Sequence, residues 1–376
     1  GQGPEIFLGI PRVTKYAIYR AADVEADPNF VPSPDDTGLV LTQDDESTTV
    51  VYVYAFDEEG NYDYCETYVL VQQNPICNGV GTGAIAGVIM TDEQEAVEGV
   101  EVNLSGGMVE SVETGVDGSF DFNNLPLGGD YTLTPYLNAN PLNGVSTFDL
   151  VLISKHILGV QALDSPYKQI AADVNQSESV TTLDMIQLRK LILNIDTEFQ
   201  SNTSWRFIDA NYSFPEPTDP WLEEFPEISN VNNLSEATPN ADFIAVKIGD
   251  VNGSAQANSL VQEERNLNGE TFLELEEVEM RAGNTYTVAV TAKDFTQLQG
   301  FQGTLQLTDV ELLKMEYAEA KAEHFGFRYA EQGFVTMSWN ASAADMAVSQ
   351  DEGILFSLVL RANTDIALSE AISINS

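Results

Sequence analysis

The fold of this chain is decided by a repeated segment, which is VSTFDLVLISKHIL at residues 145–158 and VTTLDMIQLRKLIL at residues 180–193. The two copies align without gaps and are identical at six of fourteen positions. In each copy the apolar residues recur at helical spacing after a start of the form Ser/Thr-x-x-Asp. The repeat therefore predicts a pair of similar helices.

The residues before the second helix carry oxygen atoms at regular spacing. Calcium loops of the EF-hand type use oxygen ligands at loop positions 1, 3, 5, 7, 9 and 12. With Asp184 as position 12, those positions hold Asp173, Asn175, Ser177, Ser179 (through its carbonyl), Thr181 and Asp184. The pattern predicts a Ca²⁺ site. The alternative is a capping box of Thr181 and Asp184, which does not explain the residues from 173 to 177.

The loop before the first helix matches the pattern less well. With Asp149 as position 12, positions 1, 3 and 5 hold Asn138, Asn140 and Leu142. The next residue after Leu142 is Asn143. Leu142 has no side-chain oxygen, as if the turn were displaced by one residue. With a single carboxylate, this loop is expected to bind calcium more weakly, because ligand charge helps to set affinity.

A third fragment repeats the opening of the loop without a helix after it. It reads GDVNGS at residues 249–254, so that Asp250, Asn252 and Ser254 have the spacing Asp-x-Asn-x-Ser. Three interpretations stay open. The fragment donates ligands to one of the other loops, binds calcium weakly alone, or forms a plain turn.

The duplicated loop and helix resemble type I dockerins, in which Asp replaces Glu at position 12. We interpret residues 137–260 as a dockerin-like calcium-binding repeat pair with an insertion at 195–247 that is rich in Trp, Phe and Pro. Since exposed aromatic residues are costly, the insertion is expected to wrap over the helices. A carbohydrate-binding role for Trp205 and Trp221 is the alternative. The stretch also resembles segments of large secreted proteins of the Bacteroidota, which commonly leave by type IX secretion.

The N-terminal part predicts an all-β module. The β-branched and aromatic runs at 48–55 and 64–71 flank a turn at 57–61, a pattern typical of a hairpin. Residues 1–78 resemble hyaline-repeat and related immunoglobulin-like modules of bacterial surface proteins. Cys65 and Cys77 are interpreted as one disulfide formed in an oxidising compartment, or as two free buried thiols.

Two further β modules flank the helical repeat. Residues 83–136 alternate strands with Gly and Asp turns and resemble the carboxypeptidase-regulatory-like sandwich, which serves as a stalk or spacer. Residues 265–376 resemble the cohesin-like sandwich, with GFQGTL at 300–305 and LFSLVL at 355–360 carrying the resemblance. Cohesins bind dockerins, so the resemblance implies docking within the molecule or between copies. Both modules could instead be folded spacers.

The composition limits the classes of function. The chain has 376 residues, enough for two to four domains, and carries 16 Lys+Arg against 59 Asp+Glu, a net charge of −43. Such a surface repels nucleic acid and anionic membranes and attracts cations. No apolar run reaches the length of a membrane span. The two histidines are not paired in a zinc-like motif, and no nucleophile elbow or phosphate loop is present.

The sequence thus predicts a mainly β, multidomain, secreted protein with a small helical calcium-binding pair and no enzymatic activity. The first hypothesis is an extracellular structural or adhesion protein of the cell surface that calcium stabilises. The second is a recognition module in which cohesin-like and dockerin-like parts pair between chains into a fibre or complex. The third is a carbohydrate-binding or scaffold fragment of a larger secreted enzyme, with surface glycans as partners.

Overall fold

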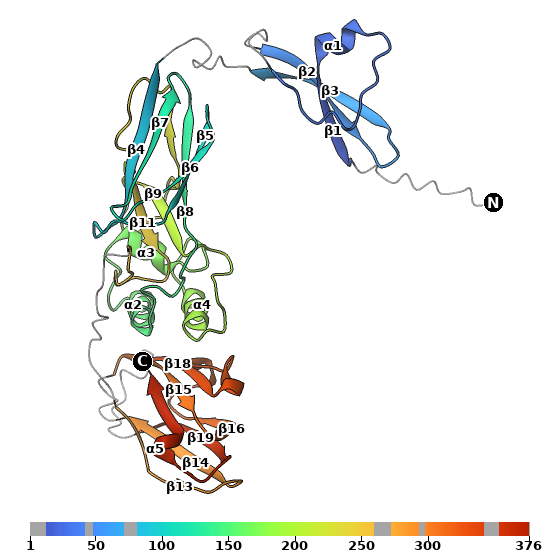
Figure 1. Cartoon of the computed structure of the whole chain (residues 1–376). Helices are drawn as coiled ribbons and strands as arrows, with labels where there is room; N and C mark the ends of the chain where they lie inside the picture. The colour runs from blue at the N-terminus through green and yellow to red at the C-terminus, as the bar shows by residue number, and fades with distance from the viewer. Residues whose placement is uncertain are drawn as a thin grey trace, which may run out of the picture. The chain divides into compact units, whose positions relative to one another are not determined.

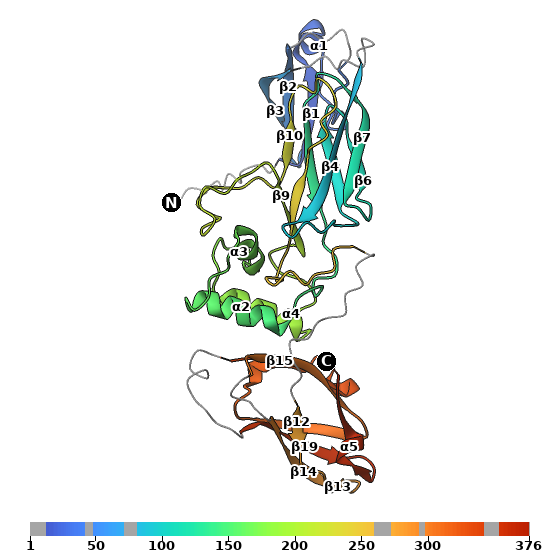
Figure 2. The ribbon, with the colours of Figure 1, turned by 90° about the vertical axis from the view of Figure 1, so that its left-hand side faces the viewer.

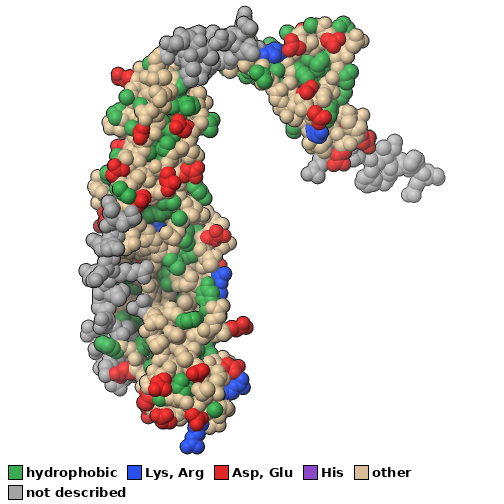
Figure 3. Space-filling view, in the orientation of Figure 1, with side chains coloured by type: hydrophobic (Ala, Val, Ile, Leu, Met, Phe, Trp, Pro, Cys, Tyr) green, Lys and Arg blue, Asp and Glu red, His purple; other side chains and the backbone are tan. Residues whose placement is uncertain are grey.

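The computed structural model describes residues 13–41, 48–70, 81–258, 272–292, 298–341 and 353–375. The chain divides into two compact units, Gly1–Gly81 and Thr82–Ser376 (Figure 1). The described part contains no helix that is long and apolar enough to cross a membrane. Acidic side chains are scattered over the visible face rather than gathered in one patch (Figure 3).

The first unit is a three-stranded antiparallel sheet with one short helix. Its elements are β1 (Lys15–Arg20), α1 (Ala21–Ala26), β2 (Thr48–Phe56) and β3 (Tyr62–Leu70), and the strand order is β1-β2-β3. The hairpin predicted from the sequence is confirmed, because β2 pairs with β3 from Thr48–Leu70 to Phe56–Tyr62. The carboxylate of Asp57 shapes the turn by accepting from the backbone N–H of Asn61 at 2.9 Å. Cys65 is exposed on β3, and the expected partner Cys77 lies outside the described residues.

The second unit begins with a β sandwich of two four-stranded sheets. Its strands are β4 (Thr82–Thr91), β5 (Glu101–Gly106), β6 (Glu110–Glu113), β7 (Ser119–Pro126), β8 (Tyr131–Tyr136), β9 (Trp205–Asp209), β10 (Ser229–Val231) and β11 (Phe243–Lys247). The sheet orders are β10-β8-β5-β6 and β7-β4-β11-β9. Alternate residues of β4, such as Ile85 and Ile89, face the core and are fully buried. Gly87 between them allows close packing, since a Cβ there would lie 2.4 Å from the carbonyl oxygen of Ala241.

The insertion at 195–247 is part of this sandwich. It supplies β9 and β11 to one sheet and β10 to the other. Phe207 and Phe243 on these strands join the sandwich core, whereas Ile208 and Val246 point the other way and join the core under the helices. The insertion was expected to wrap over the helical pair, and its part in the sandwich was not predicted. Both faces of β9 and β11 carry buried residues, because each strand lies between two layers.

Three helices form the next layer. They are α2 (Thr147–Ile157), α3 (Pro166–Ala172) and α4 (Thr182–Ile192). The helices α2 and α4 lie side by side, end-on in Figure 1 and one in front of the other in Figure 2. The prediction of two similar helices is therefore confirmed. Each of the two helices has eleven residues. Both begin with a capping box, formed by Ser146 and Asp149 in α2 and by Thr181 and Asp184 in α4. Leu150, Ile153 and Leu188 are fully buried in the core beneath them.

The C-terminal part is a second β sandwich. Its elements are β12 (Leu273–Leu275), β13 (Glu279–Met280), β14 (Thr285–Ala292), β15 (Gly300–Leu307), β16 (Val310–Tyr317), β17 (Phe325–Gly326), β18 (Phe334–Asn340), β19 (Ile354–Ala362), β20 (Ile366–Ala367), α5 (Leu368–Ala371) and β21 (Ile372–Asn375). Two four-stranded sheets, β12-β14-β19-β16 and β17-β18-β15-β21, enclose the core, and β13 pairs with β20. Its buried centre includes Leu305, Val335 and Phe356.

The helical pair packs on the β15–β18 sheet of this second sandwich. The backbone N–H of Thr147 donates to Gln302 Oε1 at 2.8 Å, and the hydroxyls of Thr147 and Ser338 lie 2.7 Å apart. At the other end, the hydroxyl of Thr336 donates to the carbonyl of Leu193 at 2.7 Å. Gly326 allows this approach, because a Cβ there would lie 2.3 Å from the same carbonyl oxygen.

Substitution of Phe243 tests whether the insertion belongs to the first sandwich. Phe243 is 1% exposed on β11, so Phe243→Ala leaves a cavity between the sheets. We expect a loss of about 3–5 kcal/mol in the free energy of unfolding. Leu222→Ala, in the same insertion but 60% exposed, is the control and is expected to change stability little. Denaturant titration measures both, and equal stabilities of the two variants would contradict the assignment.

Candidate metal sites

The loop between α3 and α4 folds around two buried carboxylates. Asp173 ends α3, Asp184 lies in the first turn of α4, and both are 0% exposed. The backbone N–H groups of Ser177 and Glu178 donate to the two carboxylate oxygens of Asp173, each at 2.8 Å. The N–H of Asn175 donates to Asp184 Oδ1 at 3.1 Å. Backbone amides therefore turn both acidic groups toward one loop.

The loop encloses an oxygen that has no hydrogen-bond donor. Asn175 Oδ1 is buried and has no partner among the described residues. Burial raises the pKa of Asp173, the two backbone amides oppose this rise, and the charge of Asp184 adds to it. A buried, unpartnered amide oxygen near two acidic groups is costly unless a cation is present. This is the electrostatic environment that a divalent cation would relieve.

Asp184 takes part in the capping box of α4 and in the loop before it at the same time. Asp184 Oδ2 accepts from the N–H of Thr181 at 2.8 Å, while Oδ1 accepts from the loop. The hydroxyl of Thr181 is occupied by the cap, since it lies 3.0 Å from Asp184 Oδ2 and accepts from the N–H of Leu183. The hydroxyls of Ser177 and Ser179 lie 3.2 Å apart at the exposed side of the loop. An ionised carboxylate retains further lone pairs for a metal after such bonds.

The structure brings Asp149 of α2 together with the distant fragment at 249–254. Asp149 Oδ2 accepts from the N–H of Ser146 at 2.8 Å, as Asp184 does from Thr181. Asp149 Oδ1 accepts from the N–H of Val251 at 2.9 Å across 102 residues of chain. Asp250 in turn accepts from the N–H of Ala255 at 2.7 Å. Asp149 and Asp250 are 0% and 7% exposed, so this is a second buried carboxylate pair.

The two arrangements match closely. Each first aspartate accepts from the N–H groups four and five residues later, Ser177 and Glu178 for Asp173 and Ser254 and Ala255 for Asp250. Asn252 Oδ1 is buried without a partner among the described residues, as Asn175 Oδ1 is. The hydroxyl of Ser254 donates to the carbonyl of Gly144 at 2.9 Å and ties the fragment to the chain before α2.

Two of the three asparagines that precede α2 have other hydrogen-bond partners. Asn138 Oδ1 accepts from the N–H of Ser204 at 3.0 Å. The side chain of Asn143 bonds to both backbone groups of Gln256, at 2.8 and 3.0 Å. Asn140 has a φ of 47° and turns the chain. Three interpretations of the fragment at 249–254 were open. The structure favours the one in which the fragment contributes to another loop, here the loop at the start of α2. The sequence feature that indicated this role was the Asp-x-Asn-x-Ser spacing, which the fragment shares with residues 173–177.

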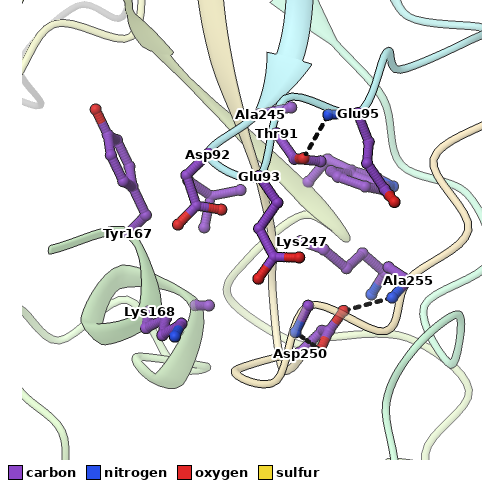
Figure 4. A pocket seen from close by; sticks show the side chains of 14 residues that line it. Thr91, Asp92, Glu93, Glu95, Tyr167, Lys168, Ala245, Lys247, Asp250 and Ala255 are labelled. Atoms are coloured by element: carbon purple, nitrogen blue, oxygen red, sulfur yellow. Dashed lines mark hydrogen bonds between the residues drawn. The ribbon is translucent and has the colours of Figure 1, made fainter. Parts of the chain in front are cut away.

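A buried lysine near the second pair was not predicted from the sequence. Lys247 is 5% exposed and donates to the carbonyls of Pro141 and Ile248 at 2.8 and 3.0 Å. Burial lowers its pKa to about 8, against the attraction of Asp250 and Asp149. Burial and the charge of Asp250 raise the pKa of Asp149 to about 7. Figure 4 shows Lys247 and Asp250 in one small pocket beside Glu93.

The donor atoms at both loops are oxygens. Among the described residues no group of three or more His, Cys, Asp or Glu forms a metal cluster. Each loop instead offers two carboxylates, and its other oxygen atoms are neutral. Carboxylate, amide, hydroxyl and carbonyl oxygens suit hard cations such as Ca²⁺. The residues therefore fit the predicted ion in kind, and the two unpartnered Asn oxygens give the fit a structural basis.

The raised pKa of Asp149 makes a pH-dependent contribution to stability in calcium-free buffer. The folded protein keeps a proton that the unfolded chain loses at lower pH, so the contribution is present in acid and is lost as pH rises through about 7. We expect the melting temperature of the wild type to fall more between about pH 5 and about pH 8 than that of Asp149→Asn. The variant controls for general repulsion in this acidic chain. Calorimetry that finds equal pH responses would contradict the assignment.

Comparisons with known proteins find similarity only to solved structures, each over a part of this chain. No family model and no curated protein matches the chain. Similar solved structures include a type I cohesin–dockerin complex from Clostridium thermocellum (12% identity, 26% of this chain and 75% of that chain, TM-score 0.22). Another is the third cohesin ScaC with the ScaB dockerin from Acetivibrio cellulolyticus (13%, 28% and 85%, 0.22). The major pilin subunit BcpA of Bacillus cereus is similar over 27% of this chain and 29% of its own (16% identity, TM-score 0.14). The fold class is the predicted one, β-sandwich modules with a small helical pair.

Proposed function

We propose that this chain is a non-enzymatic, extracellular structural or adhesion protein whose helical pair is held in place by two calcium ions. The first ion would be held by Asp173, Asn175 and Asp184. The second would be held by Asp250, Asn252 and Asp149. The proposed calcium sites and the proposed extracellular location are consistent with each other. Calcium is abundant outside the cell, where even sites with millimolar dissociation constants are filled.

The observation that carries the proposal is the match between the two loops. Two segments far apart in the sequence each place a buried carboxylate pair around a buried Asn oxygen that lacks a donor. Chance would rarely leave the same costly defect twice in the same position. A bound cation explains both defects at once, and the capping boxes alone do not.

Each ion would close a different part of the structure. The first would join the end of α3 to the start of α4. The second would join α2 to the segment that leaves β11, so that the end of the sandwich sheet is tied to the helices. Ions that bind only the folded state stabilise it by mass action. A protein that has to resist unfolding outside the cell gains from such bonds.

Substitution of the unpartnered asparagines separates metal binding from capping. Asn175 Oδ1 makes no hydrogen bond to any residue that the structure describes, so Asn175→Ala should leave the stability in excess chelator nearly unchanged. With millimolar calcium, the variant should lose part of the rise in melting temperature that the wild type shows. Asn252→Ala should do the same for the second ion. Asn211→Ala, at an exposed turn, is the control.

Calcium titration followed by calorimetry and fluorescence measures these melting temperatures. If calcium fails to raise the melting temperature of the wild type, the calcium part of the proposal is wrong. If the asparagine variants respond like the wild type, the ion lies elsewhere.

A second candidate function is assembly between chains. The specific observation is the contact of α2 and α4 with the sheet of β15 and β18, which relies on hydrogen bonds such as Thr147 with Ser338. Lys155 Nζ also donates to Gln299 Oε1 at 2.9 Å. The same surfaces could meet between two copies of the chain, since a polar contact of this kind can exchange. Such an exchange would link chains head to tail.

Light scattering at increasing protein concentration tests this second function. An exchanging interface predicts a mass that rises with concentration, and Ser338→Lys should abolish the rise because Ser338 is 0% exposed against Thr147. Thr285→Lys, at an exposed position of the opposite sheet, is the control. A constant monomer mass at all concentrations would restrict the contact to one chain.

A further inference from the structure

A groove of about 490 Å³ lies beside the loop that runs from Asp173 to Asp184. This groove has no role in the function proposed above. One wall is the end of β8, at residues 134–136, and another is the start of β9, at residues 205–207. β10 pairs with β8 only from Tyr131 to Leu133, so it does not cover the end of that strand. The rim is completed by Gln176 of the loop and by residues 200–203.

Most residues that line the groove are polar, more of its exposed surface is apolar, and the lining carries no net charge. Its charged residues, Arg206 and Glu227, neutralise each other through two hydrogen bonds of 2.7 and 2.9 Å. The guanidinium also lies 5.0 Å from the ring centre of Phe225. The other polar side chains are amides and hydroxyls, such as Gln176, Gln200 and Ser201. In a chain of net charge −43, this is an unusually neutral surface.

The groove also presents an aromatic ring to solvent. Tyr136, at the end of β8, is 50% exposed, and Ile228, just before β10, is 40% exposed. Trp205, by contrast, is 4% exposed and belongs to the core, so the sugar-stacking role considered for it from the sequence is not available. Tyrosine combines an apolar face with a polar hydroxyl and suits a ligand of mixed character.

We propose that this groove binds a neutral oligosaccharide, with a sugar ring stacked on Tyr136. The apolar C–H face of a sugar fits the tyrosine ring, and the sugar hydroxyls fit amides, which both donate and accept. Acidic glycans are excluded by the charge of the chain. A peptide added as a β-strand fits less well, because Pro135 removes a backbone donor from the end of β8.

The calcium loop forms part of the groove. Gln176 stands between Asn175 and Ser177 with a φ of 56°, and Asn202 Nδ2 donates to the carbonyl of Asp173 at 3.2 Å. Calcium at Asp173 would therefore hold one rim of the groove in place. This dependence on calcium rests on the proposed function, whereas the stacking role of Tyr136 does not.

Isothermal titration of the whole chain with neutral oligosaccharides tests the proposal. The probes are cellohexaose, xylohexaose, mannohexaose and chitohexaose, in calcium buffer. At least one should bind, and Tyr136→Ala should weaken it about tenfold, which corresponds to about 1.4 kcal/mol. Tyr317→Ala is the matched control, because Tyr317 is 43% exposed on the second sandwich and outside the groove. Its affinity should equal that of the wild type.

The outcomes separate the groove from the metal. Absence of binding to all four probes overturns the proposal, and so does binding that Tyr136→Ala leaves unchanged. Binding of an extended peptide at the groove in place of the sugars also overturns it. If chelator lowers the melting temperature but not the affinity for sugar, the calcium link is wrong while the groove assignment holds. If chelator changes neither, the proposed calcium function fails and the groove assignment again holds.

Discussion

Buried carboxylates impose the main constraint on the second unit. Asp149, Asp173 and Asp184 are 0% exposed in a chain that already carries a net charge of −43. Removing such groups from water is costly unless donors or cations surround them. The chain meets this requirement with backbone N–H groups, which tight loops and the starts of α2 and α4 direct toward the carboxylates. Much of the course of the chain before α4 and after β11 follows from this need.

The strands β9 and β11 transmit this constraint to the first sandwich. Their inner faces pack in the sandwich core and their outer faces pack under the helices. The chain runs from the end of β11 at Lys247 almost directly into Asp250, so the carboxylate loop is anchored to a strand of the sheet. The helical pair is therefore not a separate module attached to a stalk. Loosening of the loops would be expected to reach the sheet, because interiors are closely packed and transmit strain.

The sequence predicted what local patterns encode. The two helices and the hairpin of β2 and β3 followed from periodicity and turn residues, whereas the β-sandwich class followed from the resemblance to known modules. It did not predict the partner of Asp149, because counting back along the chain assumes that a loop and its helix are adjacent. Val251 of the fragment at 249–254 lies 102 residues from Asp149, and only the spacing that the fragment shares with 173–177 hinted at the link. Burial of Lys247 and the two-sided burial of β9 depend on contacts between distant segments, which no local pattern encodes.

The start of α2 joins the two halves of the second unit. Asp149 holds the segment after β11, while Thr147, two residues earlier, bonds to Gln302 and Ser338 of the second sandwich. A shift at the first turn of α2 would have to move both contacts, since a capping box fixes that turn. A cation at Asp149 would then stabilise the docking surface as well as the loop. Carboxylate burial, helix capping and the contact between the helices and the second sandwich are thus parts of one local arrangement.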